Sequence, residues 1–578
     1  MTIKEQIEKD LGAAFTQAGL DKNKAVVMVS AIDICDYQCN ACFALGKELG
    51  IPPFKLSQQI AGIFRSDTAS CEAVPPAFLN FKVTDSALTK TVNSLIETEK
   101  LPIAAQPQRT VFFDYGGANI AKELHVGHLR SPIVGEALKR VFQALGHDTV
   151  SDVYLGDWGL QNGLIFSELE HQNYVTGGKF VKSVTLDVLN EIYPLASRKK
   201  DSDPVFKKRA DEITLLLQQK QEPWFGLWKV LRKISVSRIR ENYDRLGCTF
   251  DLYNGESDAQ PYVEEVLEIL KQQNLAYDDN NCLIMNVANE SDKAPMPPII
   301  LKKYNGGDLY ATNDVATVYY RMQRYKPDEF IYLTDARQSL HFEQVFRCVK
   351  LGGLVNDETK LTHIGYGTMN GADGKPFKTR AGGTIKLEEV IELVRQAAAK
   401  RLAENKAGGD GTSAQKIGLA ALKFADLSNN VRKDYVFDPD KFTSFEGKTG
   451  PYILYTIARI NSIFLKSNPD SAKAGNRKKV NKQSAHTIYI TDNTRGIMVK
   501  ILKLCDAYPA AAANYTLNGI TDAAWALAAA FNIFYGSVNI LREQDKNVQM
   551  LYLSLCSAVR TALKYAMHTL AIDTVEEM

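Results

Sequence analysis

Apolar residues in the first hundred positions alternate between helical and strand-like spacing. The residues from Met1 to Gln6 are typical of an amphipathic helix, and we expect further helices over 40–49 and 56–64, separated by Pro52-Pro53. Residues 75–81 predict a turn that leads into a strand, and residues 101–107, rich in proline and small side chains, predict a linker. The chain therefore begins with a small α+β unit.

From Thr110 the pattern changes to strand, loop, helix and strand. The apolar run 111–115 predicts a buried strand, residues 129–144 a helix closed by Gly146, and residues 149–155 the next strand. A β-α-β opening is typical of a doubly wound parallel sheet, in which ligands bind at the carboxyl ends of the strands.

The rest of the chain adds insertions and a helical region. We expect a helical insertion over about 180–245, a hairpin over 298–311 with its turn at Asn305-Gly306, strands near 330–333 and 363–366, and a glycine-rich loop over 371–383. After residue 413 the pattern is helical to the end, interrupted by a polar basic tract at 467–482. The predicted fold is α/β and multidomain: an N-terminal α+β domain (1–106), a Rossmann-like catalytic domain with insertions (107–405) and an all-helical C-terminal domain (406–578).

Composition narrows the class of protein. The 578 residues are 45% hydrophobic and 24% charged, as in ordinary globular proteins, and no apolar run is long enough to cross a bilayer. The first residues do not read as a signal peptide, and nine scattered cysteines favour reduced thiols in a cytoplasmic protein. A formal net charge of +2 means that a polyanionic partner would meet local basic patches.

Three cysteines lie close together, at Cys35, Cys39 and Cys42. A zinc site is one interpretation, but three thiols without a second pair or a histidine make an incomplete ligand set. We therefore expect packing cysteines and no protein-bound metal.

The tetrad His125-Val126-Gly127-His128 follows the first predicted strand of the sheet. Histidines at i and i+3 share one face of a helix turn, and the start of a helix attracts anions. Gly127 leaves room for a nucleotide against the backbone, and Lys122 adds positive charge. A nucleotide phosphate site is the functional interpretation; a pair of capping or surface histidines is the alternative.

The segment around this tetrad resembles the arginyl-tRNA synthetases, which are class I aminoacyl-tRNA synthetases. Residues 114–131 resemble their ATP-binding opening, 156–159 a second nucleotide-contacting element, and 373–380 their version of the K-M-S-K-S loop. The resemblance continues through 434–438 and 445–452 and covers nearly the whole chain. It implies an arginine–tRNA ligase that uses ATP, with Mg²⁺ bound to the ATP, as substrate.

The resemblance also assigns roles to residues. It implies catalytic roles for His125, His128, Lys122 and Lys378, and ATP contacts that also include Gly127, Gly156, Asp157, Met369 and Lys375. Taken alone, the lysine loop would be a solvated turn and Asp157 a helix N-cap. For arginine it nominates Asn119, Glu256, Tyr310, Asp314 and Gln338, although from its position Asp314 also fits an N-cap. No editing domain is expected, because the donors of arginine are distinctive enough for a polar pocket to select.

Contacts with tRNA(Arg) are expected at both ends of the chain. Tyr452, Tyr455 and Arg459 share one helical face that fits base stacking, although aromatic spacing also marks a core. Tyr37, Gln38 and Asn80 are the candidates in the N-terminal domain. The resemblance implies a monomer whose first reaction step needs bound tRNA, with no DNA or membrane partner.

The chain departs from the family at Gly116 and Ala118, where members commonly carry serine and proline, so a more flexible loop is expected there. The lysine loop also departs, with Pro376-Phe377 in its middle. Two other interpretations stay open: a different adenylyl-transferring enzyme without tRNA, and an RNA-binding relative that has lost turnover.

Overall fold

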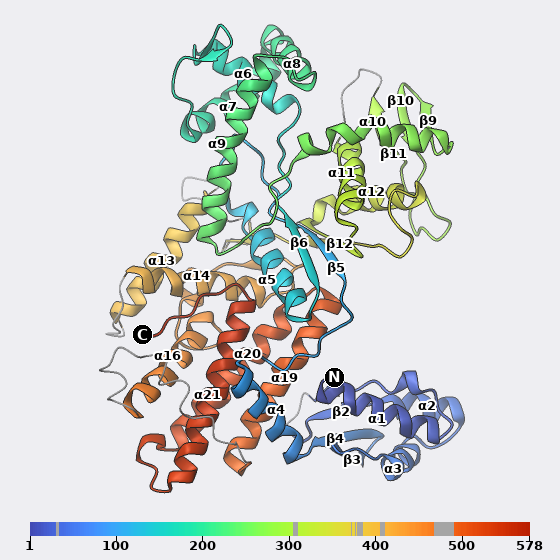
Figure 1. Cartoon of the computed structure of the whole chain (residues 1–578), viewed down its shortest axis with the longest axis vertical. Coiled ribbons are helices and arrows are strands. Elements are labelled where there is room, and N and C mark those ends of the chain that lie inside the picture. Colours follow the sequence, from blue (N-terminus) through green and yellow to red (C-terminus); the bar gives the residue numbers. More distant parts are fainter. Residues whose placement is uncertain are drawn as a thin grey trace.

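A four-stranded parallel sheet lies at the centre of the chain. The computed structural model describes residues 1–30, 34–303, 310–371, 373–375, 377, 385–404, 411–467 and 490–578. The sheet has the order β13-β12-β5-β6, with all neighbours parallel. Its strands are β5 (Thr110–Asp114), β6 (Asp148–Asp152), β12 (Glu329–Asp335) and β13 (Lys360–Tyr366). Figure 1 labels β5, β6 and β12 near the middle of the molecule. The predicted doubly wound sheet is confirmed.

The strand order reverses beside β5, which makes the crevice between β5 and β12 the place where ligands bind in such sheets. Helix α5 (Arg130–Ala144) connects β5 to β6. The predicted strand 149–155 is too long at its end, because the chain leaves the sheet after Asp152. Val153 N–H donates to the Leu252 carbonyl instead, and Leu155 bridges to Gly255.

The N-terminal unit combines α1, α2 and α3 with an antiparallel sheet ordered β1-β2-β4-β3, while its last helix, α4, packs against α19 and α21. Predicted and observed helices agree closely; α3 begins at Pro53, since proline is well tolerated in the first helical turn. Cys39 and Cys42 lie in the apolar core of this unit. The elements are α1 (Ile3–Gln17), η1 (Lys22–Lys24), β1 (Met28–Val29), β2 (Tyr37–Cys39), α2 (Ala41–Leu49), α3 (Pro53–Ile63), β3 (Ala69–Val74), β4 (Phe78–Val83) and α4 (Asp85–Thr98).

Two insertions extend beyond the central sheet (Figure 1). The first contains α6 (Leu160–His171), β7 (Val175–Thr176), β8 (Lys179–Phe180), α7 (Leu186–Ser202), α8 (Pro204–Gln218) and α9 (Trp224–Arg245), around its own apolar core. The second contains α10 (Glu256–Gln272), β9 (Ala276–Asp279), β10 (Cys282–Met285), β11 (Ile299–Lys303), α11 (Tyr310–Tyr325), η3 (Ala336–Gln338) and α12 (Ser339–Leu351).

The predicted hairpin over 298–311 is wrong. β11 pairs with β10, which precedes it in the chain, and Tyr310 and Ala311 begin helix α11. The short apolar run at 309–311 fits a strand and the first turn of a helix equally well, so three residues could not distinguish the two. The turn at Asn305-Gly306 lies outside the described residues.

The C-terminal region is helical, as predicted. A short parallel ladder between β14 (Met369–Asn370) and β15 (Tyr435–Val436) joins it to the sheet domain. The basic tract lies outside the described residues from position 468 onward. The helices are α13 (Leu387–Glu404), α14 (Gly411–Leu427), α15 (Pro439–Phe442), α16 (Gly450–Ser467), α19 (Asp492–Asn514), α20 (Asn518–Ser537), η4 (Ile540–Arg542) and α21 (Lys546–Thr569).

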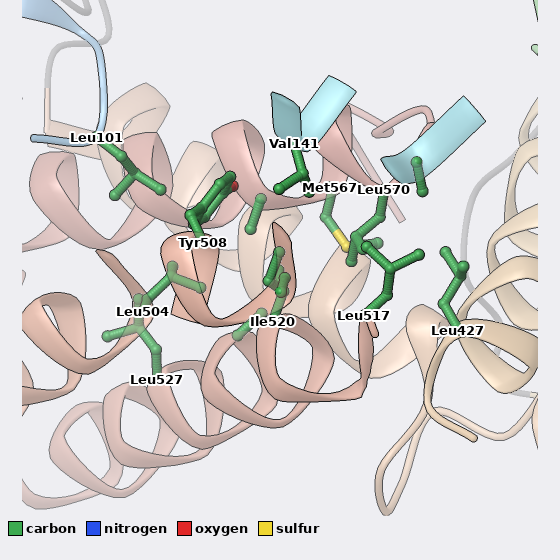
Figure 2. Packing of buried hydrophobic residues seen from close by; sticks show 14 of the residues in the cluster. Leu101, Val141, Leu427, Leu504, Tyr508, Leu517, Ile520, Leu527, Met567 and Leu570 are labelled. Carbon is green, nitrogen blue, oxygen red and sulfur yellow. The ribbon is translucent and has the colours of Figure 1, made fainter. Parts of the chain in front are cut away.

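One apolar cluster runs from the sheet domain into the C-terminal helices (Figure 2). Val141 of α5 belongs to the same cluster as Leu427 of α14, Tyr508 of α19, Ile520 of α20 and Met567 of α21. The helix that follows the histidine tetrad is thus packed directly against the C-terminal region. None of the helices in the described ranges is both long and apolar enough to span a bilayer.

Candidate active site

The histidine tetrad forms the 3₁₀ turn η2 (Val126–His128), between β5 and α5. His125 is its N-cap, and its Nδ1 accepts the Gly127 N–H at 3.1 Å. His128 Nδ1 in turn accepts the His125 N–H at 3.1 Å, and the two ring centroids are 4.1 Å apart. Gly127 is required by this packing, because an added Cβ would lie 2.9 Å from His125 Cε1.

These bonds define the chemical form of both imidazoles. Since each Nδ1 accepts a backbone N–H, the proton of each neutral ring sits on Nε2, which is then a donor. Burial, His125 and Lys122 lower the pKa of His128 to about 3, and burial and Lys122 lower the pKa of His125. Both rings are therefore neutral donors at neutral pH, and the nearby positive charge is that of Lys122.

The loop before the tetrad is held by hydrogen bonds along its length. Gly116 N–H donates to Ser131 Oγ at 2.8 Å, and the Tyr243 hydroxyl donates to the Gly116 carbonyl at 2.9 Å. Gly116 has φ +99°, a conformation in which a serine would be strained. Glycine thus fits the backbone here, and the loop is anchored at both groups of Gly116; its flexibility stays a prediction.

A polar cavity of about 220 Å³ lies beside this loop at the carboxyl edge of the sheet. It brings together four predicted ligand-binding residues: Asn119, Gly156, Glu256 and Tyr310. Asn119 and Gly156 also form a parallel bridge. The family resemblance implies a nucleotide contact for Gly156 and arginine contacts for the other three residues, so the two predicted sites adjoin. The cavity is also lined by Trp158, Gly159, Leu160, Gln161, Asn162, Gln218 and Asn313.

Glu256 is the buried acid of this cavity, with 6% of its surface exposed. Its Oε2 accepts the Trp158 backbone N–H at 3.2 Å. Burial raises the pKa of Glu256 to about 8, with the negative charges of Asp157 and Asp314 contributing. A cationic ligand would stabilise the ionised form, so the cavity favours a positively charged group.

Asp157 lies behind the cavity wall and is fully buried. Its Oδ2 accepts from Arg232 Nε at 2.6 Å and from Ser257 Oγ at 2.7 Å, and its Oδ1 accepts the Ser257 N–H at 2.9 Å. The carboxylate thus holds the start of α10, the helix of Glu256, and does not face a nucleotide. The predicted contact with ATP is corrected to a support for this wall, and sequence patterns contained no signal for its partner Arg232.

Asp314 is the fifth residue of α11 and not its N-cap. Its Oδ2 contacts His341 Nε2 of α12 at 2.5 Å, and its side chain is largely buried. His341 was not anticipated from the sequence. Gln338 lies on the exposed turn η3, outside the described residues that line the cavity.

The lysine loop starts from the β14–β15 ladder. Met369 is buried, and its sulfur accepts from the Tyr435 hydroxyl at 3.1 Å, so its side chain does not face solvent as a nucleotide contact. The Lys375 side chain is exposed, and its backbone carbonyl accepts the Gly371 N–H at 2.8 Å. Lys378 lies outside the described residues.

A buried arginine ties the carboxyl ends of the strands together beneath the site. Arg321 of α11 donates to Asp114 Oδ2 of β5 at 2.6 Å and to Asp152 Oδ2 of β6 at 3.0 Å. It also donates to the hydroxyl of Tyr332 in β12 at 3.1 Å. Burial raises the pKa of Asp114 to about 6, even though Arg321 opposes the shift. Three strands and one helix are thereby held in fixed register.

The predicted RNA contacts differ in exposure. Tyr37 is buried, and its hydroxyl donates to Asp506 Oδ2 of α19 at 2.6 Å, so this side chain joins the N-terminal unit to the C-terminal helices and is closed to RNA stacking. Gln38 and Asn80 face each other across β2 and β4, with a 2.8 Å hydrogen bond between their amides. Asn80 is buried, with 7% of its surface exposed, whereas Gln38 is partly exposed; their role as RNA contacts stays a prediction.

Arg459 of α16 lies between two exposed aromatic rings. Its guanidinium carbon is 4.7 Å from the centroid of Tyr455 and 5.0 Å from that of Tyr535 in α20. Its NH2 group donates to the Tyr455 hydroxyl at 3.2 Å. Tyr452 instead packs against the core, as the alternative interpretation had it. Tyr535 was not anticipated, since it comes from another helix.

The comparisons with known proteins agree along the chain. Residues 90–439 match the family model "tRNA synthetases class I (R), catalytic domain", residues 453–578 the DALR anticodon binding domain, and residues 1–83 the arginyl tRNA synthetase N terminal domain. The arginine–tRNA ligase of Alkaliphilus oremlandii is 38% identical over 591 residues, covering 99% of both chains. That of Agathobacter rectalis is 39% identical over 598 residues, again covering 99% of both.

Solved structures agree in fold. The arginyl-tRNA synthetase from Plasmodium falciparum superimposes with a TM-score of 0.83 at 24% identity, covering 100% of both chains. The enzyme from Thermus thermophilus superimposes with a TM-score of 0.80 at 23% identity, also over 100% of both. Together, the matched catalytic model and the full-length relatives show that this chain belongs to the arginyl-tRNA synthetase family of class I aminoacyl-tRNA synthetases.

Proposed function

We propose that the chain is an arginine–tRNA ligase, which activates arginine with ATP and transfers it to the terminal ribose of tRNA(Arg). The observation that carries this proposal is the placement of a neutral histidine pair and an acid-lined cavity at the same edge of the parallel sheet. The full-length likeness to arginine–tRNA ligases supports the choice of amino acid.

The cavity is the proposed arginine site. Glu256 offers a carboxylate to one cationic group of the substrate, and Asn119 and Tyr310 offer neutral polar groups. Asp314, held by His341, is the proposed partner of the guanidinium, and Gln338, on the exposed turn after β12, is a further proposed contact with arginine. Because Glu256 is buried, its contact with the ligand is strong only when the ligand is positively charged.

In the first step, an oxygen of the arginine carboxylate attacks the α-phosphorus of ATP. The bond between that phosphorus and the bridging oxygen breaks, and pyrophosphate leaves as arginyl-adenylate forms. The Nε2–H groups of His125 and His128 donate to the phosphate oxygens as negative charge develops, and Lys122 supplies positive charge. Mg²⁺ enters bound to ATP, and Lys375 and Lys378 are the proposed partners of the leaving phosphates.

In the second step, a hydroxyl of the terminal ribose of tRNA attacks the carbonyl carbon of the adenylate. The carbon–oxygen bond to the phosphate breaks and AMP leaves. Docking of tRNA involves the Tyr455–Arg459–Tyr535 cluster at one end and Gln38 with Asn80 at the other. We further propose that the enzyme is a cytoplasmic monomer and that the first step needs bound tRNA.

The test is arginine-dependent exchange of pyrophosphate into ATP, run with and without tRNA(Arg). Exchange that depends on arginine and tRNA supports the whole proposal. Exchange without tRNA would still support the ligase activity but would contradict the proposal that the first step needs bound tRNA. Binding of tRNA with no exchange or charging would favour an RNA-binding relative without turnover. Exchange that needs another amino acid would overturn the choice of arginine.

A further inference from the structure

Arg130 is the first residue of α5, two positions after His128, and only 2% of its surface is exposed. A buried guanidinium is costly to hold unless its donors are matched by acceptors. Here Nε donates to Asp426 Oδ1 of α14 at 2.8 Å, and NH1 donates to the carbonyls of Gly367 at 2.7 Å and Lys433 at 3.0 Å. The guanidinium also lies 5.0 Å from the ring centroid of Tyr435.

The two carbonyls belong to the two segments that lead into the β14–β15 ladder, and the lysine loop follows β14. Gly367 lies two residues before β14, and Lys433 two residues before its partner β15. The segments approach so closely at this point that a Cβ on Gly367 would lie 2.5 Å from the Lys433 carbonyl carbon. One NH1 group therefore holds both segments and connects them to the turn that carries the histidines.

The third contact connects this junction to α14. Asp426 is fully buried beside Leu427, which lies in the shared apolar cluster (Figure 2). Burial raises the pKa of Asp426, while the pair with Arg130 opposes the rise. The two side chains meet at one pair of atoms, and within the described residues Arg130 NH2 and Asp426 Oδ2 have no partner.

A buried ion pair of this kind fixes the positions of the groups that it joins but adds little to the stability of the fold. Replacing a buried ion pair by apolar side chains is often neutral or stabilising, so the net contribution of such a pair to the free energy of unfolding is small. What an apolar pair cannot replace is the donation to two backbone carbonyls from a single planar group.

Resting on the proposed ligase activity, we propose that Arg130 is a positioning residue that aligns the β14–β15 ladder, from which the lysine loop starts, with the histidine turn, and that Asp426 orients its guanidinium. The Arg130 side chain would set the distance between the groups that hold ATP from either side. A displacement of about 1 Å between such groups can cost on the order of 100-fold in rate.

The experiment compares three variants of the full chain in steady-state charging of tRNA(Arg). Arg130→Lys keeps the charge beside Asp426 but cannot reach both carbonyls and the carboxylate at once. Arg130→Met with Asp426→Leu removes the pair without leaving a buried charge. The control is Lys199→Met with Glu168→Leu, another pair with a buried carboxylate, with a closest N–O distance of 2.7 Å, located in the first insertion.

We expect Arg130→Lys to lower kcat by roughly 10- to 100-fold and to raise the KM for ATP, while the KM values for arginine and tRNA stay within about twofold. The double variant should have a melting temperature near that of the parent and the same loss of kcat. The control pair should keep the parental kcat. Because the parent is measured first, failure of the parent to charge tRNA would count against the function and not against Arg130.

Two results would overturn the proposal. One is a parental kcat for Arg130→Lys. The other is a double variant that recovers kcat together with its melting temperature, since that would leave Arg130 a purely structural role. If Arg130→Lys does not fold, the double variant decides, with kcat expressed per folded molecule.

Discussion

The side-chain oxygen of Asn119 occupies the space that a Cβ on Gly156 would need, because such an atom would lie 2.0 Å from Asn119 Oδ1. Gly156→Ala should therefore displace Asn119 and lower kcat/KM for arginine by about 10- to 100-fold. Gly62→Ala is the matched control, since its Cβ would meet nothing within 4 Å. Steady-state charging of both variants checks this, and equal activities would show that Asn119 has no role in binding.

Glu256 should make arginine binding depend on pH. Its pKa of about 8 in the empty cavity means that the carboxyl is largely protonated at lower pH, and a cation binds the ionised form. The KM for arginine should fall as pH rises from about 6 to 8, by up to about tenfold per unit in the limit. Glu256→Gln should raise the KM and flatten this dependence. A Gln variant that keeps the parental slope would place the titration elsewhere.

His128 of the histidine turn should act without titrating near neutrality. The pKa values of both histidines are lowered, that of His128 to about 3, so His128 stays neutral far below neutral pH. The kcat of the parent should show no step from His128 between about pH 6 and 8. His128→Ala should lower kcat on the order of 100-fold, with tRNA affinity unchanged in a filter-binding assay. Unchanged kcat would remove His128 from catalysis.

Asp314 should act on arginine and not on ATP. Asp314→Asn removes a charge-assisted bond of about 1.5–3 kcal/mol, which corresponds to a rise in the KM for arginine of roughly 10- to 100-fold. His341→Gln, which alters the side chain that holds Asp314 at 2.5 Å, should raise the same KM by a smaller factor. Equal effects of Asp314→Asn on the KM values for ATP and arginine would count against the guanidinium assignment.

Arg459 should matter for tRNA alone. Its guanidinium lies between Tyr455 and Tyr535, and loss of a stacked platform costs about 1–3 kcal/mol per base. Arg459→Ala should raise the KM for tRNA about tenfold and leave the KM for arginine unchanged. Arg395→Ala, which removes an exposed arginine paired with Glu392 on its own helix, controls for the loss of one positive charge. Similar KM values in the two variants would argue against stacking.

The fold was predictable where a pattern extends over many residues. The β5–α5–β6 unit follows from an apolar run, a helix of four turns and a closing glycine, all local features. The segment at 309–311 was too short for its period to distinguish a strand from a helix start, so tertiary contacts decided it. Strand β11 pairs with β10, which precedes it in the chain, and no local sequence pattern indicates that pairing.

The site was predictable through its residues but not through their partners. The resemblance nominated Glu256 and Asn119, and both line the cavity. The exposure of these side chains could not be predicted: Asp157 and Tyr37 are polar residues, yet each is held inward by a partner far away in the sequence. The partner residues Arg232, His341 and Asp426 could not be predicted, because each lies on a helix that only the folded structure brings close to its partner.

The division of the apolar core has a consequence for how the protein opens. The first insertion has a separate core, whereas the N-terminal unit, α5 and the C-terminal helices share one. Native-state opening follows such boundaries, because a segment unfolds alone only when it exposes its own core. Helices α6 to α8 can thus exchange their amide hydrogens in a local event, whereas α9 also contributes Ile239 and Tyr243 to the shared core. Helix α16, which carries Arg459, can exchange its amide hydrogens only when the cooperative unit that also holds the histidine turn unfolds.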